Sequence, residues 1–157
     1  MSKLVIKGPA KLNGEICVRG AKNAALPIVI ASAVSNQPVM LENIPTELKD
    51  IGVALEALQY IGCQVDVGDG RVEVRSSQIK EASLPPEISG RIRYSLLFLG
   101  LLAGKCGHVK ISVPGGCDLG TRKFDLHLDG LRQLGARVEV SQDSVEVWAD
   151  RLVGKRE

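Results

Sequence analysis

Aromatic side chains are scarce in this 157-residue chain: they make up 3% of it. Its core must therefore be built from Leu, Ile, Val and Ala. An excess of charge of one sign is also lacking, because the net charge is only +2. Such an even balance provides neither the dense basic surface of a nucleic-acid-binding protein nor the cationic face of a membrane-surface protein. We therefore expect neither nucleic acid nor a membrane as a partner.

The sequence also lacks the spacings of disulfide frameworks and metal sites. Its four cysteines form no Cys-x-x-Cys pair, its two histidines stand apart, and no phosphate-binding or dinucleotide-binding glycine motif occurs. We expect no cofactor and no metal. No secretory signal precedes the first strand pattern, so a reducing cytoplasm is the expected compartment. The longest apolar run, residues 96–103, is far shorter than the roughly 20 residues of a membrane span.

What the sequence does contain is an internal repeat. Gly62 and Gly135 each follow a predicted amphipathic helix and are 73 residues apart, and the same interval separates Val72 from Val145 in the strands that follow. The order of the preceding segments also matches, with residues 83–87 as the linker. Two tandem strand-helix-strand-helix-strand-strand units, βαβαββ, therefore explain the chain and predict an α/β fold.

Each unit begins with a strand, and in the first unit the N-terminal segment has the alternating pattern that predicts one. Residues 4–6 and 15–18 alternate as strands do, and Asn13-Gly14 between them is a hairpin signal. A helix is then expected near Asn23 as its N-cap, with Pro27 in the first turn, where a missing N–H costs little.

Three clusters have residue types suited to chemistry, and the first is residues 19–27. Here a strand pattern runs into Gly20, and Lys22 and Asn23 follow at a helix start. Free N–H groups, the helix dipole and a lysine favour a phosphate or carboxylate ligand. The alternative is an ordinary solvated lysine beside a capping asparagine.

The second cluster is the glycine-rich segment 114–122, which contains Cys117. Cys17 lies in a strand pattern and Cys63 occupies the place of Ala136 in the other repeat, so both are interpreted as core residues, and Cys106 is interpreted as part of a loop. Cys117 is next to Asp118, whose negative charge disfavours a thiolate, so a proton-donating thiol fits better than a nucleophile. An exposed loop cysteine without a role is the alternative.

The third cluster is a set of arginines, including Arg93 and Arg122, whose guanidinium groups match the geometry of phosphates. The alternative is solubilising charge at helix ends, which we favour for Arg91. Asp125 is interpreted as a possible helix cap, and His127 as a structural histidine.

At these positions the sequence resembles the enolpyruvyl transferases that act on UDP-N-acetylglucosamine in peptidoglycan precursor synthesis. The resemblance rests on GAKNAALP at residues 20–27, IRYSLLFLG at 92–100 and PGGCDLGTRKFDLHLDGLRQLGA at 114–136, and it extends over essentially the whole chain. It implies an inside-out α/β barrel pair in which each domain contains three copies of the repeat. Residues 1–20 would be strands that pack with the second domain, and residues 21–157 would form an incomplete first domain of about two repeats.

The resemblance also implies a reaction and its residues. Phosphoenolpyruvate is protonated at its methylene carbon and the 3-hydroxyl of UDP-N-acetylglucosamine attacks the adjacent carbon. The resulting ketal loses phosphate and a proton to give the enol ether. Lys22 and Asn23 would hold phosphoenolpyruvate, Cys117 would donate the proton, and Arg93 would contact the nucleotide sugar. Arg122 would touch a phosphate group. The uridine side would be formed by Lys123, Phe124, Asp125 and Leu126.

Two features keep other functions open. Lys123-Phe124 stands where the family usually has a Pro-Val type pair, which would allow a different nucleotide acceptor. Family members are also much longer, so we expect this chain alone to be inactive. Exposed apolar faces would invite self-association or a complementary C-terminal half. The non-enzyme alternative is a truncated paralogue that binds a nucleotide sugar or a partner protein.

Overall fold

The computed structural model describes residues 3–9, 11–112 and 124–154. Its elements, in chain order, are α1 (Lys22–Ser32), β1 (Val39–Glu42), α2 (Lys49–Tyr60), β2 (Gln64–Val67), β3 (Arg71–Arg75), β4 (Ser83–Leu84), α3 (Pro86–Ser89), the 3₁₀ turn η1 (Arg93–Leu96), α4 (Leu97–Cys106), β5 (His108–Ser112), α5 (Asp125–Gln133), β6 (Arg137–Val140) and β7 (Ser144–Trp148). Helices and strands are interleaved along the chain, in agreement with the predicted α/β fold.

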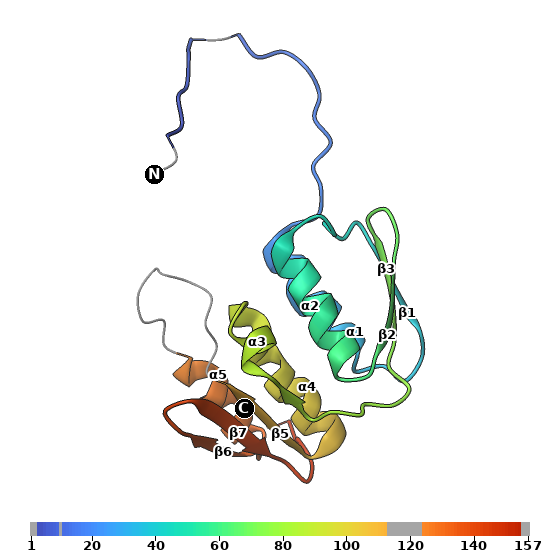
Figure 1. The fold of residues 1–157 in the computed structure, drawn as a ribbon, viewed down its shortest axis with the longest axis vertical. Helices are drawn as coiled ribbons and strands as arrows, with labels where there is room; N and C mark the ends of the chain where they lie inside the picture. The colour runs from blue at the N-terminus through green and yellow to red at the C-terminus, as the bar shows by residue number, and fades with distance from the viewer. Residues whose placement is uncertain (1–2, 10, 113–123, 155–157) are drawn as a thin grey trace.

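Two sheets divide these strands between the two halves of the chain. The first sheet has the order β1-β3-β2 and is antiparallel throughout. The second has the order β4-β5-β7-β6, in which β4 pairs in parallel with β5 and the other pairs are antiparallel. Figure 1 shows α1, α2 and α4 lying between the two sheets. This is the layer order expected of an inside-out α/β arrangement.

The predicted 73-residue repeat is confirmed in the strand register. Val65 is opposite Val74 in the first sheet, and Val138 is opposite Val147, 73 residues later, in the second. Because a slip of one residue would turn every side chain to the other face, equal register means that both units bury the same strand positions.

The two helix ends that precede these strands are also equivalent. Gly62 has a φ of +107° and Gly135 a φ of +96°, a region that favours glycine. The N–H of Cys63 donates to the carbonyl of Leu58 at 2.9 Å, and the corresponding bond after α5 runs from Ala136 to Leu131 at 3.0 Å. Both ends are Schellman motifs, so the same local chemistry stops both helices.

One continuous apolar core joins the two units. Helix α4 lies at its centre: Phe98, Leu99 and Leu102 are fully buried, as is Leu26 of α1. A second link is polar, because the Lys105 ammonium of α4 donates to the Asn36 side chain at 2.9 Å, beyond α1. The units therefore form a single folded body.

The strands expected within residues 1–20 are not formed in the described residues 3–9 and 11–20. Leu12 is 92% exposed and Ile16 is 89% exposed. Figure 1 shows this segment running away from the folded body. A strand pattern needs a sheet to join, because an isolated hairpin is marginal in water. Cys17 is exposed here, so its interpretation as a core residue is wrong. Packing of this segment against a second domain stays a prediction.

The linker prediction for residues 83–87 is also wrong. Ser83–Leu84 forms β4, which lies along β5 with Leu84 opposite Ile111, and α3 begins at Pro86. Two residues are too few to show an alternating pattern. With β4 included, the second unit has the full βαβαββ order. Among the described residues, no strand covers the corresponding outer edge of β1.

Each helix in the described part of the chain falls short of the length and apolar character needed to cross a bilayer.

Candidate functional site

The first turn of α1 brings Lys22 and Asn23 together. The helix begins at Lys22, and the N–H groups of Ala24 and Ala25 donate to the carbonyl of Ala21 at 3.1 and 2.9 Å. Ala21 is thus the N-cap, and the prediction that Asn23 caps the helix is wrong. Because the helix starts earlier than expected, Pro27 lies inside it. Asn23 is exposed in the first turn, where helix N–H groups favour anions.

The backbone just before α1 is pressed against the connection between β1 and α2. The N–H of Gly20 donates to the Asn43 side chain at 3.0 Å. A Cβ on residue 20 would lie 1.9 Å from the carbonyl oxygen of Asn43, a distance that no side chain tolerates. Asn43 itself has a φ of +56°, which asparagine adopts more readily than most residues. Glycine at position 20 is what allows α1 to start at this place.

Two ion pairs fix the same segment to α2 and the turn before it. The ammonium of Lys22 lies 2.7 Å from Oδ2 of Asp50, in the first turn of α2. The guanidinium of Arg19 lies 2.9 Å from Oε1 of Glu47. Glu47's own backbone N–H and then Arg19 lower the pKa of the Glu47 carboxyl. A lysine ammonium is therefore held at the start of a helix, an arrangement that suits a phosphate or carboxylate.

Arg93 is positioned by the segment that leads into α4. It is half-buried and is the first residue of η1, the 3₁₀ turn that leads directly into α4. Beside it the hydroxyl of buried Ser95 donates to the carbonyls of Ser89 and Ile92, at 3.1 and 2.9 Å. Arg91 forms a partly exposed pair with Glu56 at 2.7 Å, which fits the solubilising role favoured for it.

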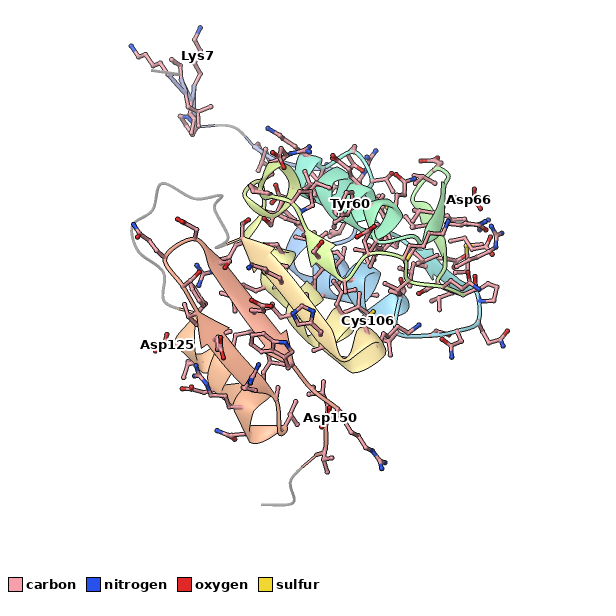
Figure 2. The ribbon with its side chains drawn as sticks, turned by 60° about the horizontal axis from the view of Figure 1, so that its bottom comes forward. Lys7, Tyr60, Asp66, Cys106, Asp125 and Asp150 are labelled. Atoms are coloured by element: carbon pink, nitrogen blue, oxygen red, sulfur yellow. The ribbon has the colours of Figure 1, made fainter. Side chains whose placement is uncertain are left out.

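The described part of the expected uridine side is the start of α5. Phe124 is the N-cap position and packs half-buried against the core, whereas Asp125 and Leu126 are exposed in the first turn. Asp125 is the first residue of the helix and not its cap. In Figure 2 it lies well apart from Tyr60 and Asp66 of the first unit. Cys117, Arg122 and Lys123 lie outside the described residues, so their assigned roles stay predictions.

The cysteines of the described residues differ in their surroundings. Cys63 is buried, as predicted for a core residue, and burial raises the pKa of its thiol. Cys106 was expected in a loop, but it is the last residue of α4. The lysine at 105 adjoins it, yet burial still raises the pKa of its thiol. Both thiols are therefore poorer nucleophiles than an unperturbed cysteine.

Sequence reasoning missed two groups of polar contacts. One is the partnership of Lys22 with Asp50, whose only sequence signal is an acidic residue in a first helical turn. The other lies on the second sheet, where the Trp148 ring is stacked on His108 with the ring centroids 5.3 Å apart and is covered by the Arg137 guanidinium at 4.1 Å. Nε2 of His127 is buried and has no hydrogen-bond partner among the residues that the structure describes. Within residues 3–9, 11–112 and 124–154, no group of three His, Cys, Asp or Glu side chains is arranged to hold a metal.

Comparison with known proteins identifies the family of this fold. The sequence profile described as EPSP synthase (3-phosphoshikimate 1-carboxyvinyltransferase) matches residues 6–154. The chain belongs to the EPSP synthase family. It shares its fold with the enolpyruvyl transferase NikO from Streptomyces tendae, with a TM-score of 0.73 and 28% identity over 90% of this chain and 31% of that one.

Members of the family that act on a nucleotide sugar resemble this chain over nearly all of its length. It is 39% identical over 155 residues to the UDP-N-acetylglucosamine 1-carboxyvinyltransferase of Hydrogenovibrio crunogenus, covering 98% of this chain and 37% of the relative. It is 41% identical to UDP-N-acetylglucosamine 1-carboxyvinyltransferase 1 of Carboxydothermus hydrogenoformans, covering 98% of this chain and 36% of that relative. The chain thus spans little more than a third of the length of these curated relatives.

Proposed function

We propose that this chain contributes to an enzyme that transfers the enolpyruvyl group of phosphoenolpyruvate to the 3-hydroxyl of UDP-N-acetylglucosamine. The observation that carries the proposal is the 39% identity to an enzyme named for that activity, over 98% of this chain. Such a reaction would serve peptidoglycan precursor synthesis and would take place in the cytoplasm, where its nucleotide-sugar substrate is made.

The geometry at the start of α1 supports the same function. Lys22 would bind phosphoenolpyruvate from a helix terminus where N–H groups and the helix dipole already favour anions. A cation that is fixed before the substrate arrives needs no reorganisation as charge develops. Asn23, exposed in the same turn, would provide a neutral side-chain donor beside it.

The remaining groups would act on the acceptor and on the proton. Arg93 would contact the nucleotide sugar, with Phe124, Asp125 and Leu126 on the uridine side together with Lys123, and Arg122 would touch a phosphate. Cys117 would deliver a proton to the methylene carbon while the oxygen of the sugar 3-hydroxyl bonds to the adjacent carbon. The hydroxyl would pass its proton to a carboxylate expected in the remainder of the enzyme. Loss of phosphate and of one methyl proton then gives the enol ether. The part of the relatives' chains that lies beyond the matched segment would supply the remaining residues of this site.

Phosphate release in the presence of each acceptor tests the proposal. The chain would be joined to the part of the Carboxydothermus hydrogenoformans relative that lies beyond the matched segment. Phosphate would be measured with phosphoenolpyruvate and, in separate reactions, UDP-N-acetylglucosamine, other UDP-sugars or 3-phosphoshikimate. We expect release with the nucleotide sugar only, and no release by the 157-residue chain alone. Release with 3-phosphoshikimate only would overturn the assigned acceptor. Release with another UDP-sugar only would favour the alternative of a different nucleotide acceptor.

A further inference from the structure

The contact between Lys22 and Asp50 joins the predicted phosphoenolpyruvate-binding lysine to a residue outside the sequence motifs. Nζ of Lys22 and Oδ2 of Asp50 are 2.7 Å apart, within the range of a charge-assisted hydrogen bond. Their side chains are 46% and 36% exposed, so the pair lies at the surface and an anion in solution can reach it.

The backbone on both sides of this contact is fixed. On the lysine side, Gly20 is pressed against Asn43, so the start of α1 has one possible place. On the carboxylate side, Asp50 lies in the first turn of α2, and the next residue, Ile51, is fully buried. A lysine side chain has several rotatable bonds, and a carboxylate on a fixed helix restricts where its ammonium can lie.

We propose that Asp50 is a positioning residue: it holds the Lys22 ammonium at the start of α1 in the orientation that receives the phosphorylated substrate. The proposal rests on the proposed function, since it takes phosphoenolpyruvate as the ligand of Lys22. Asp50 acts through the lysine and does not itself bind the anion. A carboxylate beside an anion site repels the anion. In this proposal, the fixed orientation that Asp50 gives the Lys22 ammonium favours binding by more than that repulsion opposes it.

The two effects of Asp50 predict opposite results when its charge is removed. If Asp50 only repelled the substrate, Asp50→Asn would bind phosphoenolpyruvate more tightly. If Asp50 positions Lys22, the same substitution weakens binding even though the site gains net positive charge. We expect weakening of about threefold to tenfold, the range for one partly exposed charge-assisted contact.

Phosphoenolpyruvate is titrated into the chain joined to the remainder of its Carboxydothermus hydrogenoformans relative, and the backbone amide NMR signals of residues 22–24 give the dissociation constant. The variants are Asp50→Asn, Asp50→Glu and, as a matched control, Glu56→Gln. Glu56 lies on the same helix and forms an equally short, partly exposed pair, but with Arg91. We expect Asp50→Asn to weaken binding, Asp50→Glu to restore most of it, and Glu56→Gln to leave it within twofold of wild type. In a Lys22→Ala background, Asp50→Asn should no longer weaken binding.

The outcomes separate this inference from the proposed function. Wild-type binding that Asp50→Asn leaves unchanged or tightens overturns the positioning role alone. Equal weakening by Asp50→Asn in the Lys22→Ala background overturns it too, because the effect would not pass through the lysine. Absence of any response to phosphoenolpyruvate in the joined wild-type protein overturns the assignment of Lys22 as its ligand, and the positioning role with it. Trp148 fluorescence, which reports on the second sheet, shows whether each variant is folded.

Discussion

At the scale of single residues, the position of the candidate site depends on one missing side chain. Only a glycine at position 20 lets the backbone pass Asn43 closely enough for Lys22 to reach Asp50. The sequence alone indicated the lysine, because a cation at a helix start has a general electrostatic meaning. It could not indicate Asp50 as its partner, because that pairing depends on how α2 packs against α1.

Replacing Gly20 by alanine should therefore destabilise the chain by about 1–3 kcal/mol, as expected when an added methyl group forces a backbone shift. The matched control is Gly52→Ala, because residue 52 lies in α2 with nothing within 4 Å of its added Cβ. Alanine there should raise the free energy of unfolding by about 0.5–1 kcal/mol. Urea unfolding measures both, and a Gly20→Ala variant as stable as wild type would contradict the described contact.

The outer face of the second sheet should respond to acid. A hydrogen bond with Nε2 of His108, 2.7 Å from Oε1 of Glu146, holds the pKa of the Glu146 carboxyl below its ordinary value of 4.5. A carboxyl group whose pKa is lowered on folding stabilises the fold above that ordinary value, and the contribution is lost as the pH falls through the lowered pKa. The chain should thus lose this contribution only below about pH 4.5.

The carboxyl NMR signal of Glu146 reports this directly. His108→Ala should raise the pKa of Glu146 toward its ordinary value, whereas Lys110→Ala should raise it less, because that ammonium is 3.6 Å from the other carboxylate oxygen. An unchanged Glu146 titration in His108→Ala would show that the hydrogen bond is not formed in solution.

At the scale of elements, repetition made the sequence informative. The glycines that end α2 and α5 were predicted to terminate these helices, because glycine adopts the positive φ of a Schellman motif without steric cost. The strands after them were predicted because each has an alternating pattern and a partner next in sequence. Strand β4 was missed because its partner, β5, lies beyond a helix, and residues 15–18 were expected to pair although no sheet edge receives them here.

The two equivalent glycines should differ in how much alanine costs. Both Gly62→Ala and Gly135→Ala place a side chain at positive φ, which costs at least about 1 kcal/mol. At Gly62 the new Cβ would also lie 3.1 Å from the carbonyl oxygen of Gln78, whereas at Gly135 the nearest atom is 3.8 Å away. Gly62→Ala should therefore lower the urea midpoint more than Gly135→Ala does. The reverse order would mean that crowding does not decide the difference.

At the scale of the whole molecule, the two units share one apolar core. The sequence predicts this shared core only in part. Repetition implies neighbours that bury each other's apolar faces, and α4 is apolar over most of its surface, with five buried residues in the shared core. The Lys105 contact with Asn36, by contrast, joins side chains 69 residues apart and left no pattern in the sequence.

A shared core predicts that both units unfold together. Trp148, the one tryptophan, reports on the second sheet, and the methyl NMR signals of Val74 report on the first. We expect the same urea midpoint from both probes. Leu99→Ala in α4 should lower the free energy of unfolding that each probe reports by about 2–5 kcal/mol. Separate midpoints would show that the units fold independently.

We propose that the ammonium held at the start of α1 belongs to an enolpyruvyl transferase site. Phosphate release from phosphoenolpyruvate with UDP-N-acetylglucosamine, in the chain joined to the remainder of its Carboxydothermus hydrogenoformans relative, tests it when Lys22→Ala is compared with Lys110→Ala, a lysine on the outer sheet face. We predict that Lys22→Ala lowers kcat/KM by at least about a hundredfold and that Lys110→Ala leaves it near wild type. Equal activity of the two variants would contradict the assignment of Lys22 to the substrate site.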